Sequence, residues 1–136
     1  MTLREQLLRD EGVRLRPYKD SVGKLTIGIG RNLDDVGISM SEAELMLSHD
    51  ISRAWAALIV ALSWSVRLDE ARRGVLLNMA FNLGINGLLG FERMLTACEA
   101  GDYDRAAREM LESKWATQVG PRAHRLAQQM RSGEWQ

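Results

Sequence analysis

Helical periodicity runs through most of this chain, and one stretch rich in glycine and β-branched residues interrupts it. From residue 39 almost to the end, apolar side chains recur at the spacing that places them on one face of an α-helix. Residues 13–35 break this pattern: they contain Pro17 and Gly23, and residues 19–24 are typical of a turn between two short strands. The pattern therefore predicts a helix, then a small β-hairpin lobe, then a larger helical lobe.

Capping and terminating residues set the limits of the predicted helices. The first covers residues 3–11 and stops at Gly12. Ser39 and Glu42 have the spacing of a capping box, Ser41 and Glu44 offer a second register, and the helix they open should extend to about Leu62. Glycine and proline bound the later helices, which we expect at residues 69–84, 88–100, 102–113 and 121–131.

The expected fold class is α+β and mostly α. We expect a single domain over residues 1–136, in which a β lobe (about 13–35) and a helical lobe (about 39–136, plus the helix 3–11) enclose a cleft.

Composition narrows the class of protein. The chain has 18 basic and 18 acidic side chains, and this zero net charge argues against a strongly electropositive nucleic-acid-binding surface. Cys98 is the single cysteine, so no intrachain disulfide can form, and its helical setting indicates a small packing residue. The two histidines, His49 and His124, have no third ligand nearby, so we expect neither a metal nor a cofactor. The most apolar run, residues 54–62, is too short to span a bilayer, which argues against stable membrane insertion.

Two carboxylates and a threonine stand where the predicted elements can surround one site. Glu11 ends the first helix, Asp20 lies at the hairpin tip, and Thr26 is on the returning strand. Hydrolysis of a glycosidic bond needs a proton donor at the leaving oxygen and usually a second carboxylate, and a nearby hydroxyl can orient the attacking water. Spacing alone leaves ordinary roles open, because helix-end charges and turn aspartates are common.

The residues around these three positions resemble the phage-type lysozymes, the endolysins of glycoside hydrolase family 24. In that family a glutamate is followed after eight residues by an aspartate and after five more by a threonine, and all three positions match here. The flanking motifs match as well: they are Glu11-Gly12, Tyr18-Lys19-Asp20 and Thr26-Ile27-Gly28-Ile29-Gly30. The resemblance continues in order along the chain, through residues 71–73, 78–84, 90–91, 114–115, 122–125 and 131–135.

The resemblance implies a lysozyme-like fold and a muramidase that hydrolyses the β-1,4 bond between N-acetylmuramic acid and N-acetylglucosamine in bacterial peptidoglycan. Glu11 would be the general acid, Asp20 a base or electrostatic stabiliser, and Thr26 the residue that positions the water, with inversion as the expected stereochemical course. The substrate-binding residues would be Gly28, Gly30, Asn32, Phe81 and Arg122.

Some of these substrate-binding positions keep an alternative interpretation. Phe81 stands at a family position that lines the cleft, although a core aromatic fits equally well. Arg122 stands at a position that can pair with the catalytic glutamate, although a solvated helix charge fits equally well. Gly28 and Gly30 would let the strand approach the sugar, or they would serve tight packing of the lobe.

One position departs from the familiar members of the family. Arg31 follows Gly30 where they have histidine, so a histidine–aspartate pair of some relatives cannot form here, and we expect this to affect stability more than chemistry. The connection from residue 31 to residue 38 is also short, so the β lobe should be small and the cleft more open.

The implied partner is the glycan strand of peptidoglycan, acted on by a monomer without a cofactor. An endolysin that lacks a secretory signal would stay in the host cytoplasm until a holin opens the membrane, and would then lyse the host; the N-terminal signal-anchor of some relatives stays an alternative. Two other functions stay open on the same scaffold: binding of peptidoglycan without cleavage, and lytic transglycosylation.

Overall fold

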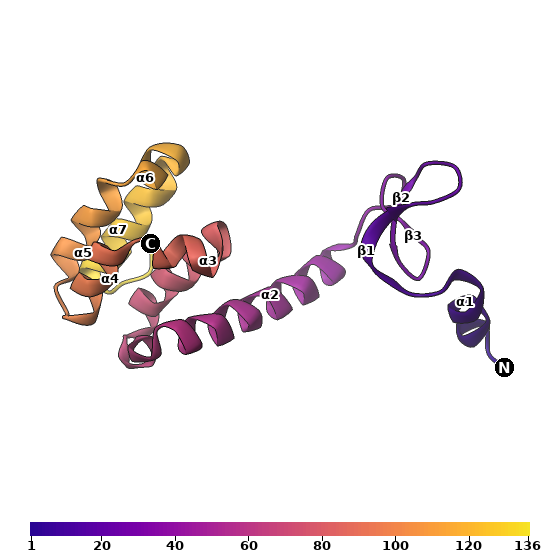
Figure 1. Cartoon of the computed structure of the whole chain (residues 1–136), viewed down its shortest axis with the longest axis horizontal. Coiled ribbons are helices and arrows are strands. Elements are labelled where there is room, and N and C mark those ends of the chain that lie inside the picture. Colours follow the sequence, from indigo (N-terminus) through magenta and orange to yellow (C-terminus); the bar gives the residue numbers. More distant parts are fainter. The chain divides into compact units, whose positions relative to one another are not determined.

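The structure is a computed structural model that describes residues 1–136 and divides into two compact units, residues 1–46 and residues 47–136. The division falls inside the long helix α2 (Met40–Ala61). Helices make up most of the chain and the strands form one small sheet (Figure 1), which confirms the predicted α+β, mostly α class.

The first unit opens with helix α1 (Leu3–Glu11), as predicted. Its start is a capping box: the Thr2 hydroxyl accepts from the Glu5 N–H, and the Glu5 carboxylate accepts from the Thr2 N–H at 2.6 Å. The helix ends at Gly12, which has a φ of 71°. Glu11 is therefore the last residue of a helix that is fixed at both ends.

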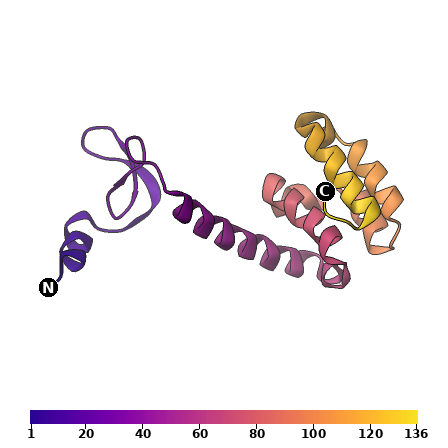
Figure 2. The same ribbon diagram turned by 180° about the vertical axis from the view of Figure 1, so that it is seen from behind.

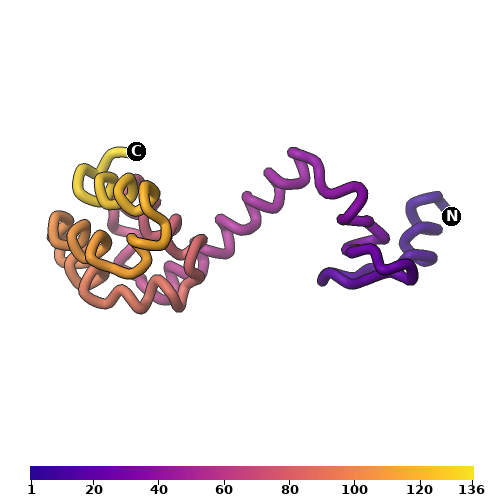
Figure 3. The backbone as a smooth tube through the Cα atoms, turned by 90° about the horizontal axis from the view of Figure 1, so that it is seen from above, coloured from indigo at the N-terminus to yellow at the C-terminus, as the bar shows by residue number.

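A three-stranded antiparallel sheet follows α1, where the sequence predicted two strands. Its strands are β1 (Arg14–Lys19), β2 (Leu25–Gly28) and β3 (Arg31–Asn32), in that spatial order. Figure 3 traces this path through the darkest part of the tube. The prediction of two strands missed β3 because a strand of two residues is too short to show an alternating pattern. Its pairing makes β2 the central strand, with Thr26 opposite Asn32.

Helix α2 begins at the first of the two predicted capping registers. The Ser39 N–H donates to Glu42 Oε1 at 2.9 Å, and the Glu42 N–H donates to Ser39 Oγ at 3.2 Å. The helix extends to Ala61, close to the predicted end.

The second unit consists of helices. After the end of α2 come η1 (Ser63–Arg67), α3 (Glu70–Leu89), α4 (Glu92–Glu99), α5 (Tyr103–Leu111), α6 (Lys114–Val119) and α7 (Pro121–Ser132). No single helix is long and apolar enough to cross a bilayer, and α3 with α4 meets the length and composition requirement only as a pair bent by 102°.

Two helix predictions in this unit need correction. Gly84 breaks α3 with a φ of 75°, as predicted, but residues 85–89 resume the helix, and the helix expected at 88–100 begins only at Glu92. The short helices η1 and α6 were not predicted, because a helix of about one or two turns carries too few apolar repeats to be recognised.

The core of the second unit lies among α3, α4, α5 and α7, and the last three of these helices lie side by side in both Figure 1 and Figure 2. Its largest fully buried side chains include Leu76, Met79, Met110 and Met130. Cys98 is buried beside Met130, with their sulfur atoms 3.9 Å apart, and burial raises the pKa of its thiol to about 12. Cys98 is thus the packing residue that the sequence indicated.

Arg72 on α3 joins three helices of this core. Its Nε donates to the Met130 carbonyl at 2.7 Å and its Nη2 donates to the Arg131 carbonyl at 2.9 Å, both in the last turn of α7. Carbonyls in the last turn of a helix have no donor within the helix, so Arg72 caps α7 from outside. The same guanidinium lies 3.7 Å from the ring centroid of Tyr103 at the start of α5.

We therefore expect Arg72→Ala to lower the free energy of unfolding by about 2–3 kcal/mol, because two helix-end carbonyls lose their donor. Urea denaturation followed by circular dichroism measures this loss. Arg105→Ala is the matched control, an exposed arginine on α5 whose loss should change the free energy by less than about 0.5 kcal/mol. Equal effects of the two substitutions would contradict the role given to Arg72.

Candidate functional site

The first unit holds six of the predicted site residues. Glu11 ends α1, Asp20 lies in the turn between β1 and β2, and Thr26 is on β2. Gly28 ends β2, Gly30 lies in the turn that follows, and Asn32 is on β3. A helix end, a turn and a central strand thus supply the three residues to which the family motif assigns chemistry.

The Glu11 carboxylate lies against the backbone of Gly30. A Cβ atom at residue 30 would stand 2.8 Å from Glu11 Oε2 and 2.9 Å from its Cδ, which is closer than such atoms approach. Gly30 also has a φ of 72°, a conformation that favours glycine. Position 30 therefore needs glycine for two reasons, and one of them is the room that the Glu11 carboxylate occupies.

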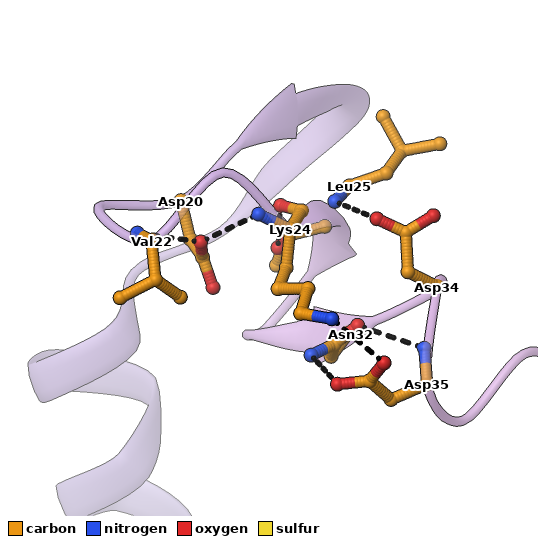
Figure 4. Close-up of polar contacts among 8 residues, drawn as sticks. Asp20, Val22, Lys24, Leu25, Asn32, Asp34 and Asp35 are labelled. Atoms are coloured by element: carbon orange, nitrogen blue, oxygen red, sulfur yellow. Dashed lines mark hydrogen bonds and ion pairs between the residues drawn. The ribbon is translucent and has the colours of Figure 1, made fainter.

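Asp20 has one carboxylate oxygen fixed and one free. Its Oδ1 accepts from the backbone N–H of Val22 at 2.9 Å and from that of Lys24 at 2.8 Å (Figure 4). The Asp20 N–H also donates to the Lys24 carbonyl at 2.9 Å, so the turn is held from both sides. Because Oδ2 accepts no hydrogen bond, it can face a water or a sugar while Oδ1 keeps the side chain in place.

Thr26 is buried at the centre of the sheet, with 3% of its surface exposed. Its hydroxyl donates to the Lys24 carbonyl at 2.9 Å. Since the hydroxyl proton is directed toward that carbonyl, the oxygen can act toward a water molecule as an acceptor. A water molecule that donates one O–H to the Thr26 oxygen would have its own lone pairs fixed in direction.

Asn32 is the centre of a network that the sequence analysis did not foresee. Its amide nitrogen donates to Asp35 Oδ2 at 2.9 Å, and its amide oxygen accepts from the Asp35 N–H at 3.0 Å (Figure 4). The Lys24 ammonium lies 3.1 Å from Asp35 Oδ1, and Asp34 accepts from the Leu25 N–H at 2.7 Å. The sequence feature that could have predicted this network is the run Asn32-Leu33-Asp34-Asp35, because Asn and Asp side chains commonly accept hydrogen bonds from nearby backbone N–H groups. Sugar binding by Asn32 stays a prediction.

Arg31 pairs with the first turn of α2. Its Nη1 and Nη2 donate to the two carboxylate oxygens of Glu42, each at 2.9 Å, and Nη1 also donates to the Gly37 carbonyl at 3.0 Å. These bonds from Arg31, with the backbone bond from Ser39, lower the pKa of Glu42 to about 2, and Glu42 in turn raises the pKa of Arg31. Arg31, the residue that departs from the family pattern, thus forms an ion pair with Glu42.

The second unit brings Phe81 and Arg122 together. Both line a pocket of about 360 Å³ whose other walls are mostly apolar and come from Leu47, Ile51, Ala54, Gly74, Leu77, Asn78 and Trp135. Arg122 donates through Nε and Nη2 to Asn78 Oδ1, at 3.0 and 2.7 Å, so a neutral amide holds its guanidinium. The Trp135 ring lies directly on Gly74, where a Cβ would stand 2.4 Å from the ring.

A larger pocket of the second unit, of about 560 Å³, holds none of the predicted site residues. It lies along the end of α3, the start of α4 and the end of α5. The chain also contains no group of three or more histidine, cysteine, aspartate or glutamate side chains arranged to hold a metal ion.

Comparison with known proteins gives one family. The Phage lysozyme family model matches residues 9–132. The chain is 29% identical to probable T4-type lysozyme 1 of Dictyostelium discoideum, over 97% of this chain and 95% of that protein. It is 30% identical to an endolysin of Acyrthosiphon pisum secondary endosymbiont phage 1, over 79% of this chain and 73% of that protein. It is also 31% identical to the pre-baseplate central spike protein Gp5 of Enterobacteria phage T4, over 93% of this chain but only 27% of that much longer protein.

The anchoring of Asp20 makes a prediction about the turn. Asp20→Ala removes the acceptor for two backbone N–H groups and should lower the free energy of unfolding by about 1–2 kcal/mol. Asp20→Asn keeps an Oδ1 acceptor and should lower the free energy of unfolding by less than about 0.5 kcal/mol. Hydrogen exchange at the Val22 and Lys24 amides measures the effect locally. Equal losses from both variants would show that the charge of Asp20, and not its acceptor geometry, holds the turn.

Proposed function

Because the chain belongs to the phage lysozyme family, we propose that it is a muramidase that hydrolyses the β-1,4 bond between N-acetylmuramic acid and N-acetylglucosamine in peptidoglycan. The main support for the proposal is the position of the Glu11 carboxylate against Gly30. The same unit contains Asp20, whose side chain is anchored by backbone N–H groups, and the buried hydroxyl of Thr26.

Glu11 is the proton donor in this proposal. Cleavage of a glycosidic bond is accelerated when a carboxylic acid protonates the leaving oxygen as the bond breaks. Gly30 presents only backbone to Glu11, so a sugar ring can approach this carboxyl without meeting a side chain from position 30.

Asp20 and Thr26 act on the opposite side of the reaction. The free Oδ2 of Asp20 accepts a proton from a water or stabilises the positive charge that develops on the sugar ring. The Thr26 oxygen accepts from the same water and aims it. A water held by protein groups attacks in a single displacement, which inverts the configuration of the sugar carbon.

Within the first unit we propose Gly28, Gly30 and Asn32 as sugar contacts, because they lie along the strand end and turn next to Thr26. Within the second unit we propose Phe81 and Arg122, which offer an apolar wall and a cation in their own pocket. Similarity to a protein named endolysin supports the further proposal that this chain lyses a bacterial host. Access to the wall through a holin is part of the same proposal.

The first test compares Glu11→Gln with the wild type. The substitution keeps the size of the side chain and removes its acid, so clearing of outer-membrane-permeabilised Gram-negative cells should slow by at least about a hundredfold. Asp10→Asn is the matched control, because Asp10 precedes Glu11 on α1 and only pairs with Arg9 in the structure. It should clear cells at the wild-type rate, and both variants should keep the wild-type circular dichroism spectrum.

Other outcomes separate the alternatives. A wild type that sediments with purified wall but clears no cells is a binding module, and the proposal fails. Mass spectra of the digest decide between the two cleavage reactions, since hydrolysis leaves reducing ends and transglycosylation leaves anhydromuramic ends.

The contact between Glu11 and Gly30 yields a second prediction on activity. Gly30→Ala and Gly101→Ala each place a side chain at positive φ, and each should cost about 1–2 kcal/mol of stability. Only at position 30 does the added methyl displace the Glu11 carboxylate, since nothing lies within 4 Å at Gly101. Gly30→Ala should therefore lower kcat at least about tenfold and Gly101→Ala should leave it unchanged. Equal kcat values at a temperature where both variants are folded would contradict the role of this contact.

A further inference from the structure

We infer that Arg31 is a positioning residue for Glu11, and that it acts through a clamp formed by the Arg31 guanidinium and the Glu42 carboxylate. The inference rests on the proposed role of Glu11 as the general acid. It concerns the position at which this chain departs from the histidine of familiar relatives, and it gives that departure a function in the site.

The clamp is a geometrically specific contact. Both terminal nitrogens of Arg31 meet both oxygens of Glu42 at 2.9 Å, and Nη1 also reaches the Gly37 carbonyl at 3.0 Å. Two parallel charge-assisted bonds fix the relative orientation of the two side chains as well as their distance. The strand β3 is thereby tied to the first turn of α2 at one point.

Each end of the clamp is itself held in place. Glu42 belongs to the capping box of α2, where its carboxylate also accepts from the Ser39 N–H at 2.9 Å. Arg31 belongs to the sheet, where it pairs with Ile27 of the central strand. Both residues of the clamp therefore belong to regular secondary structure and not to loops.

The clamp acts next to the catalytic carboxylate. Arg31 directly follows Gly30, whose backbone is in contact with the Glu11 side chain. The pairing of Arg31 with α2 restrains the adjacent Gly30 backbone, and with it the distance between Gly30 and Glu11. Loss of the clamp frees the short turn between β2 and β3 and so loosens the surface that sets the position of the Glu11 carboxyl.

The clamp stays charged over the pH range in which cells live. Its bonds lower the pKa of Glu42 to about 2 from an ordinary value of 4.5. A carboxylate with a lowered pKa contributes stability that is fully present above its ordinary value and is lost as the pH falls through the lowered one. Above about pH 5 Glu42 stays ionised, so the effect of the clamp on the position of Glu11 should not change with pH.

The test measures kcat and KM separately on soluble peptidoglycan fragments. Arg31→Ala removes the cation, and Glu42→Gln removes the anion but keeps the capping box, since glutamine serves at that position. Each should lower kcat about tenfold with KM changed less than about twofold, because the acid is misplaced while neither substitution removes a residue proposed to contact the sugar. The double variant should be no slower than the single ones, because both substitutions break the same contact. Arg31→Lys, which keeps the charge without the paired geometry, should fall between wild type and Arg31→Ala.

Arg53→Ala is the matched control, because it removes an ion pair with Asp50 on the surface of α2 within the second unit. It should leave kcat at the wild-type value. The Gly30 amide resonance should shift in Arg31→Ala and Glu42→Gln and stay in place in Arg53→Ala, a readout that needs no activity.

Three results would overturn the inference. The first is an unchanged kcat in both clamp variants while the wild type is active. The second is a raised KM at constant kcat in Arg31→Ala, which would make Arg31 a substrate contact. The third is a loss of kcat in Arg31→Ala without one in Glu42→Gln, since the arginine would then act without its partner. A wild type that cleaves nothing refutes the proposed function instead, and the amide shifts alone then decide whether the clamp holds Gly30.

Discussion

The chain reverses direction between β2 and β3 through Gly28 and Gly30, both with a φ of 72°, and the geometry of the first unit depends on this reversal. The turn creates β3, and the pairing of β3 makes β2 a central strand with a buried Thr26. It also leaves the space at Gly30 that the Glu11 carboxylate fills, and directs the next residue, Arg31, toward Glu42. A side chain at position 30 would collide with Glu11, so one constraint serves the backbone path and the site together.

Some acidic residues of the first unit stabilise its fold through hydrogen bonds, and others have carboxylate oxygens available for the proposed reaction. Asp34 and Asp35 bind backbone and side-chain donors around the sheet, and Glu42 caps α2 and holds Arg31. Asp20 does both, because one of its oxygens anchors the turn and the other accepts nothing. This division explains how a small lobe with a sheet of short strands holds the two carboxylates proposed for catalysis without a disulfide.

The second unit is stabilised differently, by an apolar core and by the guanidinium of Arg72. A core of leucine, methionine and alanine fills the space among its helices, and Arg72 supplies the donors that the end of α7 lacks. Beside this core, Phe81 and Arg122 line an apolar pocket, and Trp135, whose ring lies on Gly74, lines it as well. Residues that the family resemblance assigns to substrate contact are thus carried by α3 and α7, two helices that Arg72 joins.

By itself, the sequence determined the fold class, the approximate limits of α1, α2, α5 and α7, and the three positions that match the family motif. Those features are local: capping residues, glycine stops and helical periodicity act over a few residues, and the motif is a spacing. Only the tertiary structure decided that β3 exists, that Gly30 makes room for Glu11, and that Arg31 finds Glu42 eleven residues later. Such contacts join residues whose separation in sequence follows no period, so they depend on how the backbone turns in space. The same reason applies to Arg72, whose partners on α7 lie 58 and 59 residues away.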